Sequence, residues 1–103
     1  MKLQRYLPHG PYDFSLNAIK SIPECCGIFE LYSGESCVRI GLASNLRWRI
    51  LKLCEHPDDC VKRHWPTSVE VDLCTAFEIE KRWAVFREGL EVRGIHPVCG
   101  LES

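Results

Sequence analysis

Three stretches of the chain carry the apolar pattern of β-strands. Residues 68–74 alternate cleanly, with aliphatic side chains on one face and two carboxylates on the other, which is the two-residue period of a half-buried strand. Shorter apolar stretches at 27–32 and 37–41 flank Ser-Gly-Glu-Ser at 33–36, and a turn of this length and composition favours a hairpin. We therefore expect a two-stranded hairpin, followed later in the chain by a third strand.

The apolar positions after the hairpin recur at helical spacing instead. Leu46, Ile50 and Leu53 fall on one side of a helix over residues 45–55, because residues three and four apart share a helix face. Ser44 is a suitable N-cap, since its hydroxyl can accept a backbone N–H of the first turn. We expect this helix to bury its aliphatic side.

Two further helices are predicted, one before and one after the strands. Residues 15–21 form a short helix, and a threonine caps a long helix over residues 75–91. Residues 1–11 are expected to be irregular, because prolines and a glycine interrupt any periodicity. The order of elements predicts an α+β fold, a small three-stranded antiparallel sheet flanked by helices. We expect one compact domain over 23–103, preceded by an N-terminal extension over 1–22.

The bulk composition mainly excludes classes of protein. The 103 residues are 46% hydrophobic and 26% charged, as in a folded domain. The formal net charge is −1, so any contact with nucleic acid depends on a local basic patch. Neither a membrane span nor a signal peptide is visible. We therefore expect a cytoplasmic protein without membrane contact, whose seven cysteines are thiols in a reducing compartment.

Two short sequences, in the predicted hairpin and in the helix after it, have a fairly specific joint spacing. Residues 22–29 end in Gly-Ile-Phe, and residues 39–49 begin with Arg-Ile-Gly and continue through Asn-Leu to an arginine. Together they resemble the GIY-YIG nuclease family, which is named for its paired tripeptides. The resemblance covers about residues 23–97. Phe29 and Arg39 stand where the family has its two signature tyrosines.

The resemblance implies a metal-dependent site for phosphodiester hydrolysis. In that family a helix arginine stabilises charge on the phosphate, and a glutamate of the last long helix binds one divalent metal ion. Arg49 matches the arginine, and its planar guanidinium suits two phosphate oxygens. Glu80 matches the glutamate, with Glu88 as the alternative because of its family-like distance to Pro97. One carboxylate completed by water suits Mg2+ or Mn2+.

The two replaced tyrosines change what this site can do. Phe29 keeps the bulk of a tyrosine ring but has no hydroxyl, and Arg39 is always protonated, so neither can act as a general base. We assign Arg39 to phosphate contact, and Arg47, Lys52 and Phe29 to substrate binding. For the basic residues the alternative is an ordinary solvated surface. Trp48 and Trp65 are candidates for base stacking, although we favour packing on the core or its flank for either.

Cysteine and histidine side chains gather after the predicted middle helix. Cys54, His56, Cys60 and His64 offer two thiols and two imidazoles within eleven residues, a ligand set that zinc accepts. Their spacing is not that of a recognised finger or ribbon, and free cysteine more often packs as a small hydrophobe. We therefore favour packing over zinc. Either histidine could deprotonate a water molecule near neutral pH.

These observations lead to hypotheses of different classes. The first is a metal-dependent endonuclease of the GIY-YIG type that hydrolyses phosphodiester bonds, with DNA favoured over RNA as substrate. The second is a catalytically impaired domain that binds nucleic acid or a protein partner, including a second copy of itself. The loss of both tyrosines and the near-neutral charge favour this second hypothesis. A structural protein that shares only the architecture is the third.

Overall fold

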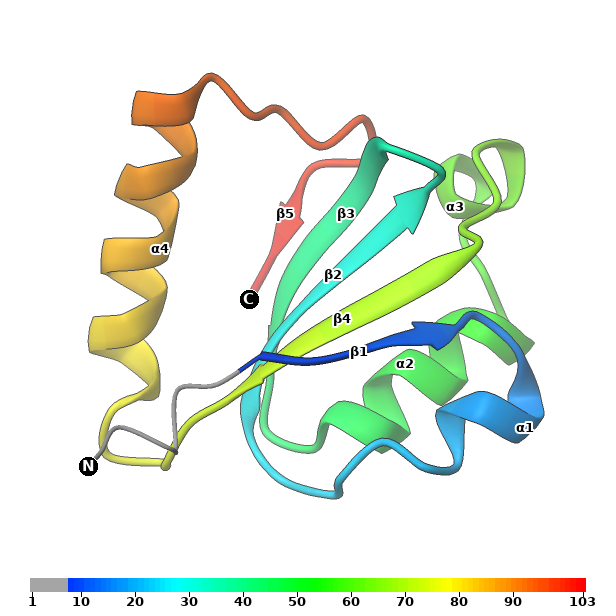
Figure 1. The fold of residues 1–103 in the computed structure, drawn as a ribbon, viewed down its shortest axis with the longest axis horizontal. Coiled ribbons are helices and arrows are strands. Elements are labelled where there is room, and N and C mark those ends of the chain that lie inside the picture. Colours follow the sequence, from blue (N-terminus) through cyan, green and yellow to red (C-terminus); the bar gives the residue numbers. More distant parts are fainter. Residues whose placement is uncertain (1–7) are drawn as a thin grey trace.

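The computed structural model describes residues 8–103 of the chain. Within this part, five strands form one sheet in the order β1-β4-β2-β3-β5, accompanied by four helices (Figure 1). The strands are β1 (Pro8–Asp13), β2 (Gly27–Ser33), β3 (Ser36–Ala43), β4 (Ser68–Leu73) and β5 (Leu101–Glu102). The helices are α1 (Leu16–Ile19), α2 (Leu46–Glu55), α3 (Asp59–Arg63) and α4 (Ile79–Arg93).

The predicted antiparallel sheet forms the centre of this larger sheet. β2 pairs antiparallel with β3 on one side and with β4 on the other. β1 extends the sheet antiparallel to β4, whereas β5 pairs in parallel with β3. The α+β class is therefore confirmed. The prediction of a three-stranded, purely antiparallel sheet is wrong, because a strand is added at each edge.

The strand β1 lies where the sequence predicted irregular structure. Its prolines and glycine motivated that prediction, but an edge strand tolerates proline, because its outer backbone groups need no partner strand. The register between β1 and β4 shifts between His9 and Tyr12, which accommodates these residues. The prediction is thus wrong for residues 8–11, while residues 1–7 lie outside the described part of the chain.

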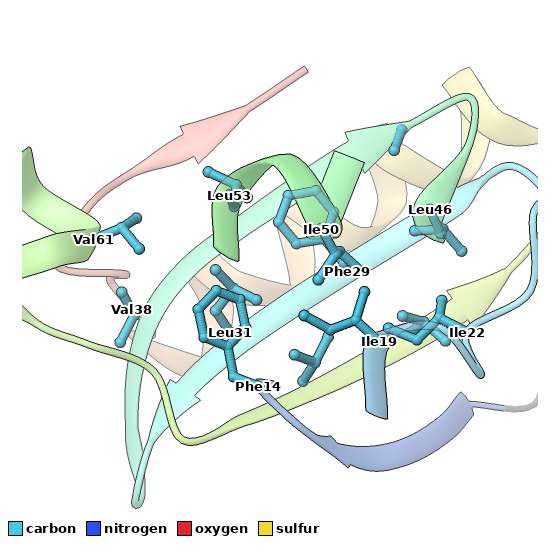
Figure 2. Close-up of a cluster of buried hydrophobic side chains, with 13 residues drawn as sticks. Phe14, Ile19, Ile22, Phe29, Leu31, Val38, Leu46, Ile50, Leu53 and Val61 are labelled. Atoms are coloured by element: carbon cyan, nitrogen blue, oxygen red, sulfur yellow. The ribbon is translucent and has the colours of Figure 1, made fainter. Parts of the chain in front are cut away.

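Helices cover both faces of the sheet (Figure 1). Alternate side chains of β2 point to opposite faces, so Phe29 joins one buried cluster and Ile28 joins the other. α4 covers the second cluster with Trp83 and Leu90. The first and larger cluster is packed against α1 and α2 (Figure 2). It contains the predicted stripe of α2, namely Leu46, Ile50 and Leu53.

The start of α2 differs from the prediction by one residue. Asn45, and not Ser44, is the N-cap, and its Oδ1 accepts the backbone N–H of Trp48 at 3.0 Å. The sequence also left α3 unpredicted. Asp58 caps this short helix by accepting the backbone N–H of Val61 at 3.0 Å, so the predicted break after α2 is itself the start of a helix.

The long helix α4 begins later than predicted and ends at Arg93, two residues beyond the predicted end. Glu78 is its N-cap residue, and the Thr75 hydroxyl donates to Glu78 Oε1 at 2.7 Å within the preceding turn. The threonine therefore orders the approach to the helix and is not its cap. Gly94 ends the helix in the left-handed conformation, with φ of 69°, which glycine adopts without steric cost.

A disulfide links α3 to the segment that follows α4. Cys60 and Cys99 are bonded with a Cα–Cα distance of 5.7 Å. The prediction that every cysteine is a thiol is therefore wrong for these two, while the other five are free. No helix over residues 8–103 is long and apolar enough to cross a membrane.

Candidate functional site

A cleft between the start of α2 and the start of α4 contains the two residues that the resemblance places at the centre of its site. Arg49 of α2 and Glu80 of α4 both line this cavity, whose volume is about 580 Å³. Trp48 forms part of its wall, and Glu102 of β5 contributes a second carboxylate. The fold therefore brings a cation and two acids, distant from each other in the sequence, to one concave surface.

Glu88 lies elsewhere on α4. It lines a separate cavity together with Arg87, Glu91 and His96. Glu80 is an exposed residue in the first turn of α4, and it shares a cavity with Arg49. Of the two candidate metal ligands, the geometry favours Glu80.

Arg49 holds the carboxylate of Glu102. Its Nε donates to Glu102 Oε2 at 2.5 Å, and its Nη2 donates to Glu102 Oε1 at 2.9 Å. This is the two-pronged arrangement in which a guanidinium binds a planar carboxylate or two oxygens of a phosphate. The hydrogen bonds to Glu102 raise the pKa of Arg49, so the guanidinium stays charged at every ordinary pH.

Arg39 is largely buried by its partners. Its side chain is 12% exposed and forms ion pairs with Asp58 and, at 3.5 Å, with Glu102. Nε and Nη2 donate to the backbone carbonyl of Cys99 at 3.2 and 3.0 Å. The pKa of Asp58 is lowered, first by the backbone N–H of Val61 and then by Arg39. The Arg39 guanidinium is thus engaged in holding segments of the fold together.

Phe29 lies beneath the site and has no exposed surface. It is completely buried and pairs with Gly41 in the β2–β3 register. A Cβ placed at Gly41 would lie closer than 3.0 Å both to the Phe29 ring and to Glu102 Cγ. The ring therefore forms part of the floor under the Arg49–Glu102 pair. Because the Phe29 side chain has no exposed surface, the predicted contact with a substrate is not possible in this structure. Packing in the core accounts for an aromatic residue at this position.

The remaining predicted binding residues lie along α2 with different environments. Arg47 donates through Nε to the carbonyl of Ile22 at 2.7 Å and pairs with Glu24 at 3.1 Å, so it anchors the segment before β2. The ammonium group of Lys52 lies 5.1 Å from the centre of the Trp48 ring. Trp48 is 58% exposed at the cavity wall. An exposed indole beside a cation is a suitable surface for a nucleobase and its phosphate.

The donors at the cleft fit a hard divalent ion. Glu80 offers an exposed carboxylate, and Ser44 lines the same cavity, as does Asn45, whose Oδ1 already accepts the Trp48 N–H. Mg2+ and Mn2+ prefer oxygen ligands and keep several water molecules when one carboxylate holds them. The chemistry of these residues is therefore compatible with the predicted metal.

The Cys54, His56, Cys60 and His64 group does not form a cluster. Cys60 is bonded to Cys99, and Cys54 packs against the larger hydrophobic cluster, as the packing interpretation predicted. Across residues 8–103, no three histidine, cysteine or acidic side chains are grouped so as to hold a metal ion.

Comparison with known proteins identified no relative of this chain. No family model, no curated protein and no solved structure matches the chain. The GIY-YIG resemblance, and the residue roles that it implies, therefore stay predictions.

Sequence reasoning missed one residue of the cleft, Glu102. Its partner Arg49 is far away along the chain, and β5 contains only two residues. No periodicity develops over two residues, so no local pattern marks the strand. The only signal in the sequence is an acidic residue after an apolar one, which is too common to be informative.

Proposed function

We propose that this protein is a metal-dependent endonuclease of the GIY-YIG type, acting on DNA phosphodiester bonds in the cytoplasm. The observation that carries the proposal is the shared cavity of Arg49 and Glu80. Hydrolysis of a phosphodiester needs a fixed cation for the developing negative charge and a Lewis acid at the phosphate. These two residues supply the cation and the metal-binding acid from different helices.

In this proposal each residue of the cleft has a separate task. Arg49 binds two phosphate oxygens and stabilises the charge that grows on them in the transition state. Glu80 holds Mg2+ or Mn2+, and the ion, when bound, polarises the phosphate. Trp48 offers a face on which a base stacks, and Lys52 beside it attracts the DNA backbone.

The experiment is divalent-dependent nicking of a supercoiled plasmid by the wild type and by single variants. Arg49→Ala and Glu80→Ala each remove one element of the site, and we expect a rate loss of about 100-fold or more from either. Glu35→Ala removes a carboxylate from the exposed β2–β3 turn, outside the cleft, and is expected to cut as the wild type does. If Arg49→Ala and Glu80→Ala also cut at the wild-type rate, the assignment is refuted.

The second candidate function is binding without cleavage. Phe29 has no hydroxyl and is completely buried, and Arg39 is engaged with Asp58 and the Cys99 carbonyl. Neither position of the two replaced tyrosines therefore offers a proton acceptor to an attacking water.

The two functions are separated by measuring DNA affinity as a function of salt alongside turnover. Binding that weakens as salt rises, without any nicking in Mg2+ or Mn2+, supports the second function. Absence of both activities leaves a protein partner or a homodimer as the ligand.

A further inference from the structure

The segment over residues 95–102 runs from the end of α4 back to β5 beside β3 (Figure 1), and its Glu102 lines the cleft; we call it the strap. Backbone hydrogen bonds fix its course along β3. The Val98 and Cys99 N–H groups donate to the carbonyls of Cys37 and Val38 at 3.1 and 2.7 Å. Beyond these, Leu101–Glu102 pairs with β3 as β5. The strap thus places one carboxylate, that of Glu102, at Arg49.

Glu102 occupies the donors that a phosphate would use. A carboxylate held through Nε and Nη2 presents two oxygens to the guanidinium fork, as a phosphate does. The Arg49 side chain is 36% exposed and that of Glu102 is 20% exposed, so the pair lies at the cleft wall. A phosphate that enters the cleft must displace Glu102 before it can form the same two hydrogen bonds.

One covalent bond and one polar contact hold the strap in this position. The disulfide between Cys60 and Cys99 ties it to α3, and Arg39 donates two hydrogen bonds to the Cys99 carbonyl. Both bonded cysteines are partly exposed, so a reductant can reach them. The disulfide closes a loop with a sequence separation of 39, and closing such a loop restricts the freedom of the strap to leave.

We propose that the strap is a redox-controlled latch, in which Glu102 competes with phosphate for Arg49 while the Cys60–Cys99 bond is intact, and in which a dithiol reductant weakens that competition. The proposal rests on the proposed function, since it takes phosphate as the ligand of Arg49. It also accounts for a disulfide in a protein assigned to a reducing compartment, where such bonds are usually transient.

The chemical step is a thiol–disulfide exchange. A thiolate of the dithiol attacks one sulfur of the pair, the S–S bond breaks, and the other cysteine leaves as a thiolate that takes up a proton. The second thiol of the reductant then attacks the mixed disulfide. Two electrons pass to the protein, which gains two thiols, and the reductant becomes a cyclic disulfide.

Four of the five free cysteines are poorly suited to exchange with this bond. Burial is the main cause that raises the thiol pKa of Cys25, Cys54 and Cys74, and that raises the pKa of Cys37 to about 11. A raised pKa leaves little thiolate at neutral pH, and thiolate is the attacking species. These four thiols therefore compete poorly with an external dithiol for the bond between Cys60 and Cys99.

The test compares oxidised and reduced protein in binding a short fluorescein-labelled DNA duplex without divalent metal. Counting thiols in denaturant fixes the two states, since the oxidised chain has five free cysteines and the reduced chain has seven. An ion pair at a partly exposed site limits the expected gain to about five-fold in affinity on reduction. Glu102→Ala is expected to give that gain in the oxidised state and no further gain on reduction, while Glu35→Ala leaves the ratio unchanged.

Equal affinity of the oxidised and reduced wild type, with Arg49-dependent binding in both, overturns the latch. So does a Glu102→Ala protein that binds no tighter than the oxidised wild type. The Arg49 Nε–H signal in a nitrogen-15 spectrum tests the latch without DNA. Reduction must shift that signal towards its position in Glu102→Ala, and an unmoved signal refutes the latch. If no variant binds DNA but the signal shifts, the proposed function fails, and with it the competition with phosphate, while the release of Arg49 by Glu102 on reduction is supported.

Discussion

Gly41→Ala adds one methyl group at a crowded position of the β2–β3 hairpin. Gly41 faces Phe29 across the hairpin, and a Cβ there would lie closer than 3.0 Å to the Phe29 ring and to Glu102 Cγ. Phe29 is completely buried, so its ring cannot turn away without displacing the core. The backbone of Gly41 is not left-handed, so the expected cost is steric and not conformational.

The magnitude follows from two opposing effects. Overpacking a well-packed core costs about 1–3 kcal/mol. An alanine also restricts the unfolded chain, which offsets about 0.4–1 kcal/mol of that cost. With the middle of each range, the net expectation for Gly41→Ala is a loss of about 1.3 kcal/mol in the free energy of unfolding, a large share of the stability of a small domain.

The assay is urea unfolding followed by tryptophan fluorescence, with stability read from the midpoint at constant slope. Gly89→Ala is the matched control, because a Cβ there meets only the Arg93 guanidinium, at 3.8 Å. Gly89 lies inside α4, where alanine is favoured over glycine, so this variant should gain about 0.5–1 kcal/mol.

A double-mutant cycle then identifies the cause of the Gly41→Ala loss. Phe29→Leu removes the ring atoms that the new methyl group would meet, so the cost of Gly41→Ala should shrink in that background. A Gly41→Ala protein as stable as the wild type refutes the steric reasoning. An unchanged cost beside Phe29→Leu shows that the ring is not responsible.

Two further predictions concern helix caps. Asn45→Ala should cost about 1 kcal/mol by removing the cap of α2, whereas Ser44→Ala should change stability by less than about half of that; thermal or urea unfolding of both decides which residue is the cap, and equal losses contradict the assignment. Asp58 has a folded-state pKa below its ordinary 3.8, so it stabilises the fold above pH 3.8 and this contribution is lost as the pH falls through the folded-state pKa. Asp58→Asn should therefore lower stability at neutral pH and match the wild type in strong acid, and a pH-independent difference would exclude the ionised carboxylate as the cause.

The central strands were predictable because the sheet buries many of their side chains, which must then be apolar. β4 is buried on one face, and this burial imposes the two-residue period that residues 68–74 display. β2 is buried on both faces at its start, so its sequence is a short apolar run and not an alternation. β1 and β5 lie at the edges of the sheet, where proline is tolerated and two residues suffice. α3 has five residues and one buried side chain, Val61, so it shows no amphipathic repeat.

Some residues of the candidate site could likewise be predicted from local sequence, and others could not. The positions of Arg49 and Glu80 in one cleft agree with a resemblance that fixed each residue by its local spacing. The partners of Arg49 and Arg39 are set by tertiary structure, and Glu102 and Cys99 reach them from beyond α4. Local sequence patterns hold no information about such pairings, because the chain between the partners is free to take any course.

Arg39 explains much of how the strap is held on β3. A guanidinium that is 12% exposed needs acceptors, since an unpaired buried charge is costly. The Cys99 carbonyl, Asp58 and Glu102 are those acceptors, and two of them belong to the strap. Arg39 therefore holds the strap on β3, and the strap delivers Glu102 to Arg49. A tyrosine at position 39 would offer one hydroxyl in place of five N–H donors, so the guanidinium is what lets this position hold the strap that carries Glu102 to the cleft.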